Sequence, residues 1–205
     1  MNTKKYIIRA FIAIGAVLIL LVLCSVILWI ISETTSSAPE FDYYFYEPNY
    51  ELDVSDFPEY LQKNRNIKYT DETLQQIEIN SENYENRGET GRFFYKYFKA
   101  IEEGDHETFN SLHEKKLLRK RGKKKEFTKQ MIYDIELSFM SETKIDDETE
   151  AVQYSLKYCI YRNDGTFRDD MGSDMSRKQY ITVYYNLKTD DAKIHNIQTE
   201  YTVNK

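Results

Sequence analysis

The side chains best suited to proton transfer or metal binding are the three histidines, His106, His113 and His195. His106 and His113 are seven residues apart, whereas a metal-binding pair on one helix is usually spaced by four. No cysteine cluster accompanies them, so the sequence predicts no metal site and no cofactor. An acid–base pair of His195 with Asp134 is the arrangement that would make this chain an enzyme.

Sequence motifs of catalysis are missing elsewhere in the chain. It contains no Gly-rich phosphate loop, no Gly-x-Ser-x-Gly motif and no nucleophile at a recognisable spacing from a base. Asp169, Asp170 and Asp174 lie within six residues of one another, but their spacing lacks the pattern of a calcium loop. We therefore predict no catalytic residues, and we expect residues 168–177 to form a flexible hairpin tip.

The strongest local feature is a basic run of eight charges within eleven residues. It consists of Lys115, Lys116, Arg119, Lys120, Arg121, Lys123, Lys124 and Lys125. The plain interpretation is a solvated helix end and loop. The functional interpretations are contact with anionic lipid or wall polymers, or with an acidic segment of the same or a neighbouring chain. Nucleic acid is not expected as a partner, because the charge pattern described below places the run outside the cell.

Residues 32–62 carry eight carboxylates and no basic residue. We single out Asp42, Glu47, Glu51 and Asp53 as its acidic interaction residues. Phenylalanine and tyrosine residues are interleaved with these acids, which is unusual for a plain solvated spacer. The segment either packs its rings on its own domain or the lipid surface, or provides a docking strip for a partner. Residues 70–77 have the composition of a helix start and favour a brief helix.

An uncharged, apolar run extends from residue 10 to residue 31. As a helix, its 22 residues span about 33 Å, close to the hydrocarbon thickness of about 30 Å. The apolar core of a cleaved signal peptide would be shorter, so we predict an uncleaved single-pass anchor in the cell membrane. Lys4, Lys5 and Arg9 precede the span and no base follows before Lys63, which places the N-terminus in the cytoplasm and the remainder outside.

The composition of the 205-residue chain, 41% hydrophobic with a net charge of −6, averages this anchor with a polar remainder. We divide the chain into a cytoplasmic tail (1–9), a transmembrane helix (10–31), an acidic aromatic stalk (32–88) and one globular domain (89–203). Cys24 falls in the span and Cys159 in the domain, so the two cannot pair. An exported domain without an internal disulfide is typical of a Gram-positive bacterial exterior.

Two helices are expected at the start of the globular domain. Phe94, Tyr97, Phe98 and Ile101 recur at the spacing of one helical face. Gly104 is a natural helix stop, and the aspartate after it is suited to cap a second helix.

Alternating apolar and polar residues then predict about four strands of a curved antiparallel sheet, giving an α+β fold. The inward-facing positions of the first two strands are candidates to line a pocket. They are Tyr133, Ile135, Leu137, Tyr154, Leu156 and Tyr158.

The stretch FYKYFKAIEEGD at residues 94–105, followed by further helical segments and four strands, resembles the NTF2-like (cystatin-like cone) superfamily over residues 89–203. The resemblance implies a bent sheet that wraps a long helix and leaves a conical pocket. The layout of tail, span and external domain is also similar to inner-membrane assembly factors of conjugation and type IV secretion machines.

The predicted function is a membrane-anchored, extracytoplasmic, non-catalytic module for protein binding, self-association or envelope assembly. A small-ligand sensor or enzyme that uses the cone is one alternative. A component of a conjugation or secretion apparatus is the other.

Overall fold

The structure is a computed structural model that describes residues 43–189 and 191–200. The predicted tail and transmembrane helix, Asp42 and the end of the predicted domain at residues 201–203 lie outside this range. Within the range, no helix has the length and apolar character needed to cross a membrane.

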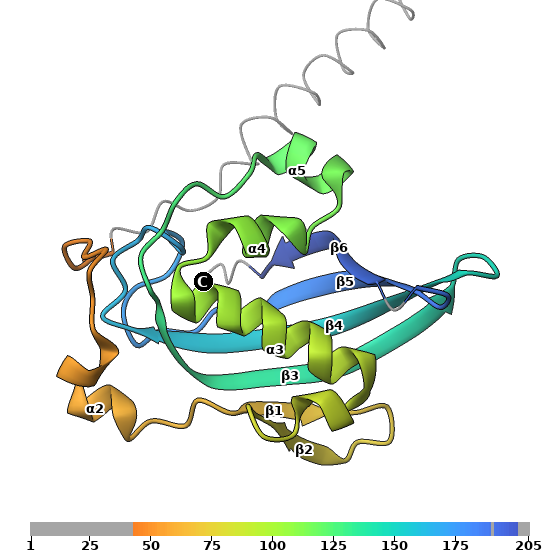
Figure 1. Cartoon of the computed structure of the whole chain (residues 1–205), viewed down its shortest axis with the longest axis horizontal. Coiled ribbons are helices and arrows are strands. Elements are labelled where there is room, and N and C mark those ends of the chain that lie inside the picture. Colours follow the sequence, from red (N-terminus) through yellow and green to blue (C-terminus); the bar gives the residue numbers. More distant parts are fainter. Residues whose placement is uncertain (1–42, 190, 201–205) are drawn as a thin grey trace, which may run out of the picture. The chain divides into compact units, whose positions relative to one another are not determined.

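Helices pack on a curved, open sheet of six strands in the order β2-β1-β3-β4-β5-β6, and α3 crosses one face of it (Figure 1). The segment before the sheet contains η1 (Val54–Asp56) and α2 (Pro58–Leu61). The elements that follow in the chain are β1 (Ile67–Thr70), β2 (Gln76–Ile79), η2 (Tyr84–Asn86), α3 (Gly88–Glu103), α4 (His106–Ser111), α5 (Lys115–Arg121), β3 (Met131–Lys144), β4 (Thr149–Tyr161), β5 (Gln179–Asn186) and β6 (Asp191–Thr199).

The α+β class and the helix-on-sheet arrangement are confirmed, but the prediction of about four strands is wrong. The two additional strands, β1 and β2, come from the segment predicted as a stalk. β1 pairs parallel with β3, with Ile67 opposite Ile135, so the sheet is not purely antiparallel. The brief helix expected at residues 70–77 is instead the tip of the β1–β2 hairpin, where the Asp71 carboxylate accepts hydrogen bonds from the backbone of Thr73 and Gln75.

The end of α3 and the start of α4 lie where local chemistry directs them. Gly104 ends α3 in the left-handed conformation at φ 71°, and a Cβ there would lie 2.9 Å from the carbonyl oxygen of Phe127. Any other residue would therefore meet both backbone strain and a fixed obstacle. Asp105 caps α4 by accepting a hydrogen bond from the Thr108 amide at 2.9 Å, as its position after the glycine predicts.

Aromatic side chains fill the space between α3 and the sheet. The ring of Phe94 meets that of Tyr154 edge-on at 4.9 Å, and Phe98 meets Tyr158 in the same way at 5.7 Å. Such edge-to-face pairs add specific geometry to ordinary apolar burial. The interior of the bent sheet is therefore a packed core along most of α3.

Five of the six predicted pocket residues belong to this core, namely Ile135, Leu137, Tyr154, Leu156 and Tyr158. Tyr133 lies in a second cluster with Tyr60 and Met131. The reason is a bulge in β3, where the pairing register with β4 shifts between Tyr133 and Glu136 and Asp134 has φ 49°. A bulge inserts one residue and so reverses the facing of side chains beyond it. These pocket candidates therefore lie mainly in packed core, and Tyr158 also borders a hollow described below.

Residues 43–60, which we name the acidic strap, pack on the second cluster through Phe57 and include its member Tyr60. The Tyr46 amide donates to the Asn163 carbonyl oxygen at 3.0 Å. The Arg162 guanidinium lies 4.5 Å from the ring centre of Tyr46 and 5.2 Å from that of Phe57. The folded domain therefore begins well before residue 89, inside the predicted stalk.

Candidate functional site

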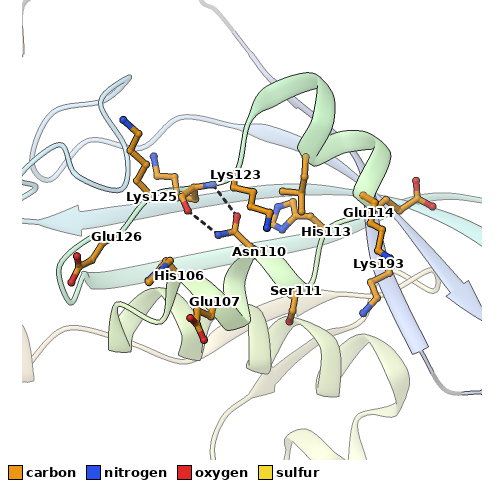
Figure 2. A pocket seen from close by; sticks show the side chains of 13 residues that line it. His106, Glu107, Asn110, Ser111, His113, Glu114, Lys123, Lys125, Glu126 and Lys193 are labelled. Atoms are coloured by element: carbon orange, nitrogen blue, oxygen red, sulfur yellow. Dashed lines mark hydrogen bonds between the residues drawn. The ribbon is translucent and has the colours of Figure 1, made fainter.

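The basic run occupies α5, at the top of the view in Figure 1, and the loop after it. The loop is held against α4 by a pair of hydrogen bonds between the Asn110 side chain and the backbone of Lys124 (Figure 2). Each bond measures 2.8 Å. One asparagine therefore satisfies both backbone groups of a loop residue and fixes where the neighbouring lysines emerge.

The start of α5 is fixed to the sheet edge by β6. The Ile194 amide donates to the Leu112 carbonyl oxygen at 2.8 Å, and the Glu114 amide donates to the Ile194 carbonyl oxygen at 3.0 Å. His195 Nδ1 lies 2.8 Å from a carboxylate oxygen of Glu114, and the His195 ring stacks on Tyr184 at 4.0 Å. These contacts make the basic run part of a defined surface.

The fold places His195 far from Asp134, the acid with which the enzymatic interpretation paired it. His195 is on β6 and Asp134 on β3, three strands away, which corresponds to about 14 Å across the sheet. His195 has Glu114 as its partner instead. The structure therefore does not bring together the acid–base pair that the enzymatic interpretation required.

None of the eight basic residues lies within 4.0 Å of a carboxylate in the part of the chain that the structure describes. The Arg121 guanidinium donates to the carbonyl oxygen of Ile197, which leaves its charge uncompensated. By contrast, lysines elsewhere on the surface pair with acids, as Lys99 does with Glu103 at 3.2 Å and Lys144 with Asp147 at 2.8 Å. The run is a concentrated, uncompensated positive charge.

A groove of about 1040 Å³, which we name the basic groove, lies between α4, the start of α5 and the loop after it (Figure 2). Five lysines line it, namely Lys115, Lys123, Lys124, Lys125 and Lys193. Three glutamates, Glu107, Glu114 and Glu126, also contribute to the walls. The lining is positive in balance, and most of its accessible surface is apolar.

A second hollow of about 710 Å³, which we name the aromatic cavity, lies on the other side of the same loop. Its lining includes the rings of Tyr97, Phe109, Tyr158 and Phe167. Gln179 also borders it, and the side-chain oxygen of this glutamine is buried without a hydrogen-bond partner among the described residues. A buried acceptor without a donor is unfavourable, so this atom marks a place where a ligand donor would gain affinity.

Lys124 lies at the boundary of both hollows. Its ammonium nitrogen is 5.5 Å from the ring centre of Phe167. Burial lowers the pKa of Lys124, because desolvation penalises the charged form, and the negative charge of Asp169 opposes this shift. An anion bound at this position would stabilise the charged form of the Lys124 ammonium group.

His113 is buried between the two hollows and bordered by both. Its Nδ1 lies 2.7 Å from the Phe109 carbonyl oxygen, so that nitrogen is the donor and Nε2 is the acceptor of a neutral ring. Burial lowers the pKa of His113, which favours this neutral form. His106 begins α4 and His113 follows its end, so the two histidines do not share one helix.

An ion pair supports the floor of the aromatic cavity. The side chain of Arg168 is nearly buried, donates to both carboxylate oxygens of Asp170, and donates from Nη1 to the Tyr158 hydroxyl at 3.0 Å. Burial would raise the pKa of Asp170, but the hydrogen bonds and charge of Arg168 outweigh it and lower that pKa. The expectation of a flexible tip at residues 168–177 is wrong, because this loop is anchored in the core.

The predicted acidic residues lie away from the basic groove. Glu47, Glu51 and Asp53 are exposed on the acidic strap, and the Asp53 carboxylate accepts from the Ser55 amide at 2.9 Å. Within the described range, no ion pair joins the strap to the basic run. The two charged segments predicted from the sequence are both present on the surface, and the fold keeps them apart.

The sequence pattern predicts four of the five lysines of the groove and, as a pocket candidate, Tyr158 of the aromatic cavity. It does not indicate Lys193 or most of the other residues that line the cavity. Arg168, Phe167 and Gln179 come from a loop and a strand more than forty residues beyond the basic run. Comparisons with protein-family models, with curated proteins and with solved structures found no match to this chain.

Proposed function

We propose that this chain is a membrane-anchored, extracytoplasmic binding module with an NTF2-like domain, and that it binds an anionic partner in the envelope through the basic groove. The observation that carries the proposal is the run of eight bases without carboxylate partners among the described residues. The anchor and the external location rest on the sequence pattern at residues 1–31.

The electrostatics of the groove favour binding over a purely solvated role. Like charges so close together repel one another, which destabilises the free protein slightly, and a negative partner relieves that repulsion. The loop that carries three of the lysines is fixed by Asn110, so the charges are already arranged before a partner arrives. Preorganised charges lose less entropy on binding than mobile ones.

Neutralising the loop lysines is expected to abolish most of the binding. In the variant K123Q/K124Q/K125Q, we expect at least a tenfold loss of affinity for the partner recovered from native membranes, because three positive charges of the groove disappear. Pull-down with the full-length chain from native membranes, quantified for each recovered partner, measures this loss. The wild-type interaction should also weaken as salt is raised from about 0.1 M to 0.5 M.

The matched control is K96Q/K144Q/K188Q, which removes the same charge from exposed lysines elsewhere on the domain. This control should retain the wild-type affinity. Equal loss in both variants would attribute the effect to net charge and would contradict a specific groove. Full retention in the loop variant would overturn the proposal.

The aromatic cavity supports a second candidate function, the binding of a small amphipathic anion. Its rings provide an apolar lining, Lys124 provides a partly buried positive charge, and Gln179 provides an unsatisfied acceptor. This combination suits a ligand with an aromatic or acyl body, an anionic group and one hydrogen-bond donor.

An aromatic sulfonate dye such as anilinonaphthalene sulfonate is a suitable probe for this cavity. We expect saturable fluorescence enhancement with the folded chain and roughly tenfold weaker binding to Lys124→Gln, since the buried charge is lost. Lys188→Gln is the matched control and should bind as the wild type does. Dye binding that is equal in both variants would show that the cavity is not the site.

A further inference from the structure

The acidic strap presents negative charge and exposed tyrosines on the same surface. It contains five carboxylates and no basic residue between positions 43 and 60. Its acidic residues are exposed, as are Tyr44 at 78% and Tyr50 at 54% of their full surface. Exposed tyrosines beside charged groups are typical of protein interfaces, where they provide large contact areas at low entropic cost.

Within one copy, the strap cannot leave its place to reach the basic groove without breaking several contacts. It is held by the Tyr46–Asn163 backbone hydrogen bond and by the packing of Phe57 and Tyr60 against the second cluster. The Tyr60 hydroxyl also donates to the Ile132 carbonyl oxygen at 2.9 Å. In Figure 1, α2, at the end of the strap, lies at the lower left and α5 lies at the top. Neither charged surface therefore meets its counterpart within the described part of the same copy.

We infer that the acidic strap of one copy binds in the basic groove of a second copy of this chain. The inference rests on the proposed function, because it names the anionic partner of the same groove. The groove is lined by five lysines and three glutamates and adjoins the further bases of α5, and the strap carries five carboxylates and no base. The two surfaces therefore carry opposite net charges.

The apolar character of the groove complements the tyrosines of the strap. Most of its accessible surface is apolar, and the aliphatic stems of its five lysines are among the groups that line it. The rings of Tyr44 and Tyr50 would lie against these stems, and their faces attract the ammonium groups. Charge pairing would then set the orientation, while ring burial would supply the non-polar contact.

This contact joins two different surfaces, so it is heterologous and leaves a free groove and a free strap at the two ends of every pair. Such contacts build rings or open chains and not a closed two-fold dimer. Copies anchored in one membrane share one orientation, which permits side-by-side growth in the plane. The inference therefore predicts assemblies larger than a dimer at high concentration.

Reciprocal charge reversal tests this inference with the full-length chain in a nonionic detergent. One variant is K123E/K124E/K125E, and the other is E47K/E51K/D56K. We expect wild-type copies with different tags to co-purify and to form salt-sensitive assemblies in sedimentation equilibrium. Each variant alone should lose at least tenfold in association, because its two surfaces then carry the same sign. Mixing the two variants should restore co-purification to near the wild-type level.

The control for the acidic variant is E72K/E82K/E142K, which reverses three exposed carboxylates outside the strap. Mixed with K123E/K124E/K125E, it should restore association far less than the strap variant does. Equal restoration by both, or no restoration by the strap variant, would overturn the inference. If wild-type copies do not associate with one another, the inference of self-binding is overturned. If K123Q/K124Q/K125Q still abolishes capture of another partner in that case, the proposed function stands.

Discussion

Phe94→Ala is expected to lower the free energy of unfolding by about 3–5 kcal/mol, the usual range for removing a fully buried phenylalanine. The side chain has no exposed surface and lies 4.9 Å from the ring of Tyr154, 5.2 Å from that of Phe93 and 6.2 Å from that of Tyr97, measured between ring centres. Those rings come from both α3 and the sheet, so they cannot all close around the cavity that alanine would leave.

Chemical denaturation of the full-length chain in detergent, followed by near-ultraviolet circular dichroism of its tyrosines, measures this loss. Tyr44→Ala is the control, because it removes an aromatic ring that is largely exposed, and we expect a change within about 0.5 kcal/mol. A loss below 1 kcal/mol for Phe94→Ala would contradict the packing of α3 against the sheet.

Arg168→Met is expected to lower the free energy of unfolding by about 3–5 kcal/mol at neutral pH, because breaking a buried ion pair leaves its partner charged and desolvated. Asp170 would keep only a distant contact with the guanidinium of Arg177, at 3.9 Å. The Tyr158 hydroxyl would also lose the donor that now lies 3.0 Å away. The methionine preserves most of the apolar volume, so the loss reports on the charge.

The pH dependence of this effect follows from the carboxylate. Arg168 holds the pKa of Asp170 below its usual value, so the pair stabilises the fold above the unfolded pKa of about 3.9. This contribution is lost as the pH falls through the lower pKa of the folded state. The difference in stability between wild type and Arg168→Met should therefore be largest near pH 7 and should shrink below about pH 4.

Denaturation midpoints of both proteins between pH 3 and pH 8 check this expectation. Arg162→Met is the matched control, since Arg162 is exposed and contacts the rings of Tyr46 and Phe57 without an ion pair in the described range. Its effect should stay below about 1 kcal/mol and should not vary with pH. A pH-independent loss for Arg168→Met would show that packing and not charge is responsible.

Elements with local signals could be predicted from the sequence. The apolar spacing of α3, the glycine at its end and the aspartate that caps α4 act within a few residues of one another, so each is readable along the chain. The alternation of β3, β4 and β5 is equally local. These elements account for the confirmed α+β arrangement.

The missed elements depend on distant partners. β1 and β2 are four residues each, too short for alternation to distinguish them from a helix start or a loop. The facing of Tyr133 depends on a bulge that nothing in the local alternation marks. Strict alternation predicts that Tyr133 and the later apolar residues of β3 face the same side of the sheet. The residue inserted at the bulge reverses the facing, so this prediction fails at Tyr133.

The candidate site also has one part with a local sequence signal and one part that depends on distant residues. A run of lysines is visible in any sequence, so the positive wall of the groove could be predicted. The aromatic cavity needs Phe167 and Gln179 to meet Phe109 and Tyr97 from separate elements, and only the tertiary fold creates that proximity. The partner of His195 was missed because Glu114 reaches it from the start of α5.

The parallel pairing of β1 with β3 has a consequence for the order of folding. Ile67 and Ile135 are 68 positions apart, and all of α3, α4 and α5 lies between them. Closing so long a loop is entropically unfavourable until the intervening helices have condensed. We therefore expect the β1–β2 hairpin to dock late, with low φ-values at Ile67 and Ile79 and high values in the β3–β4 hairpin. During synthesis this N-terminal hairpin emerges first and remains without its sheet neighbour until β3 is complete.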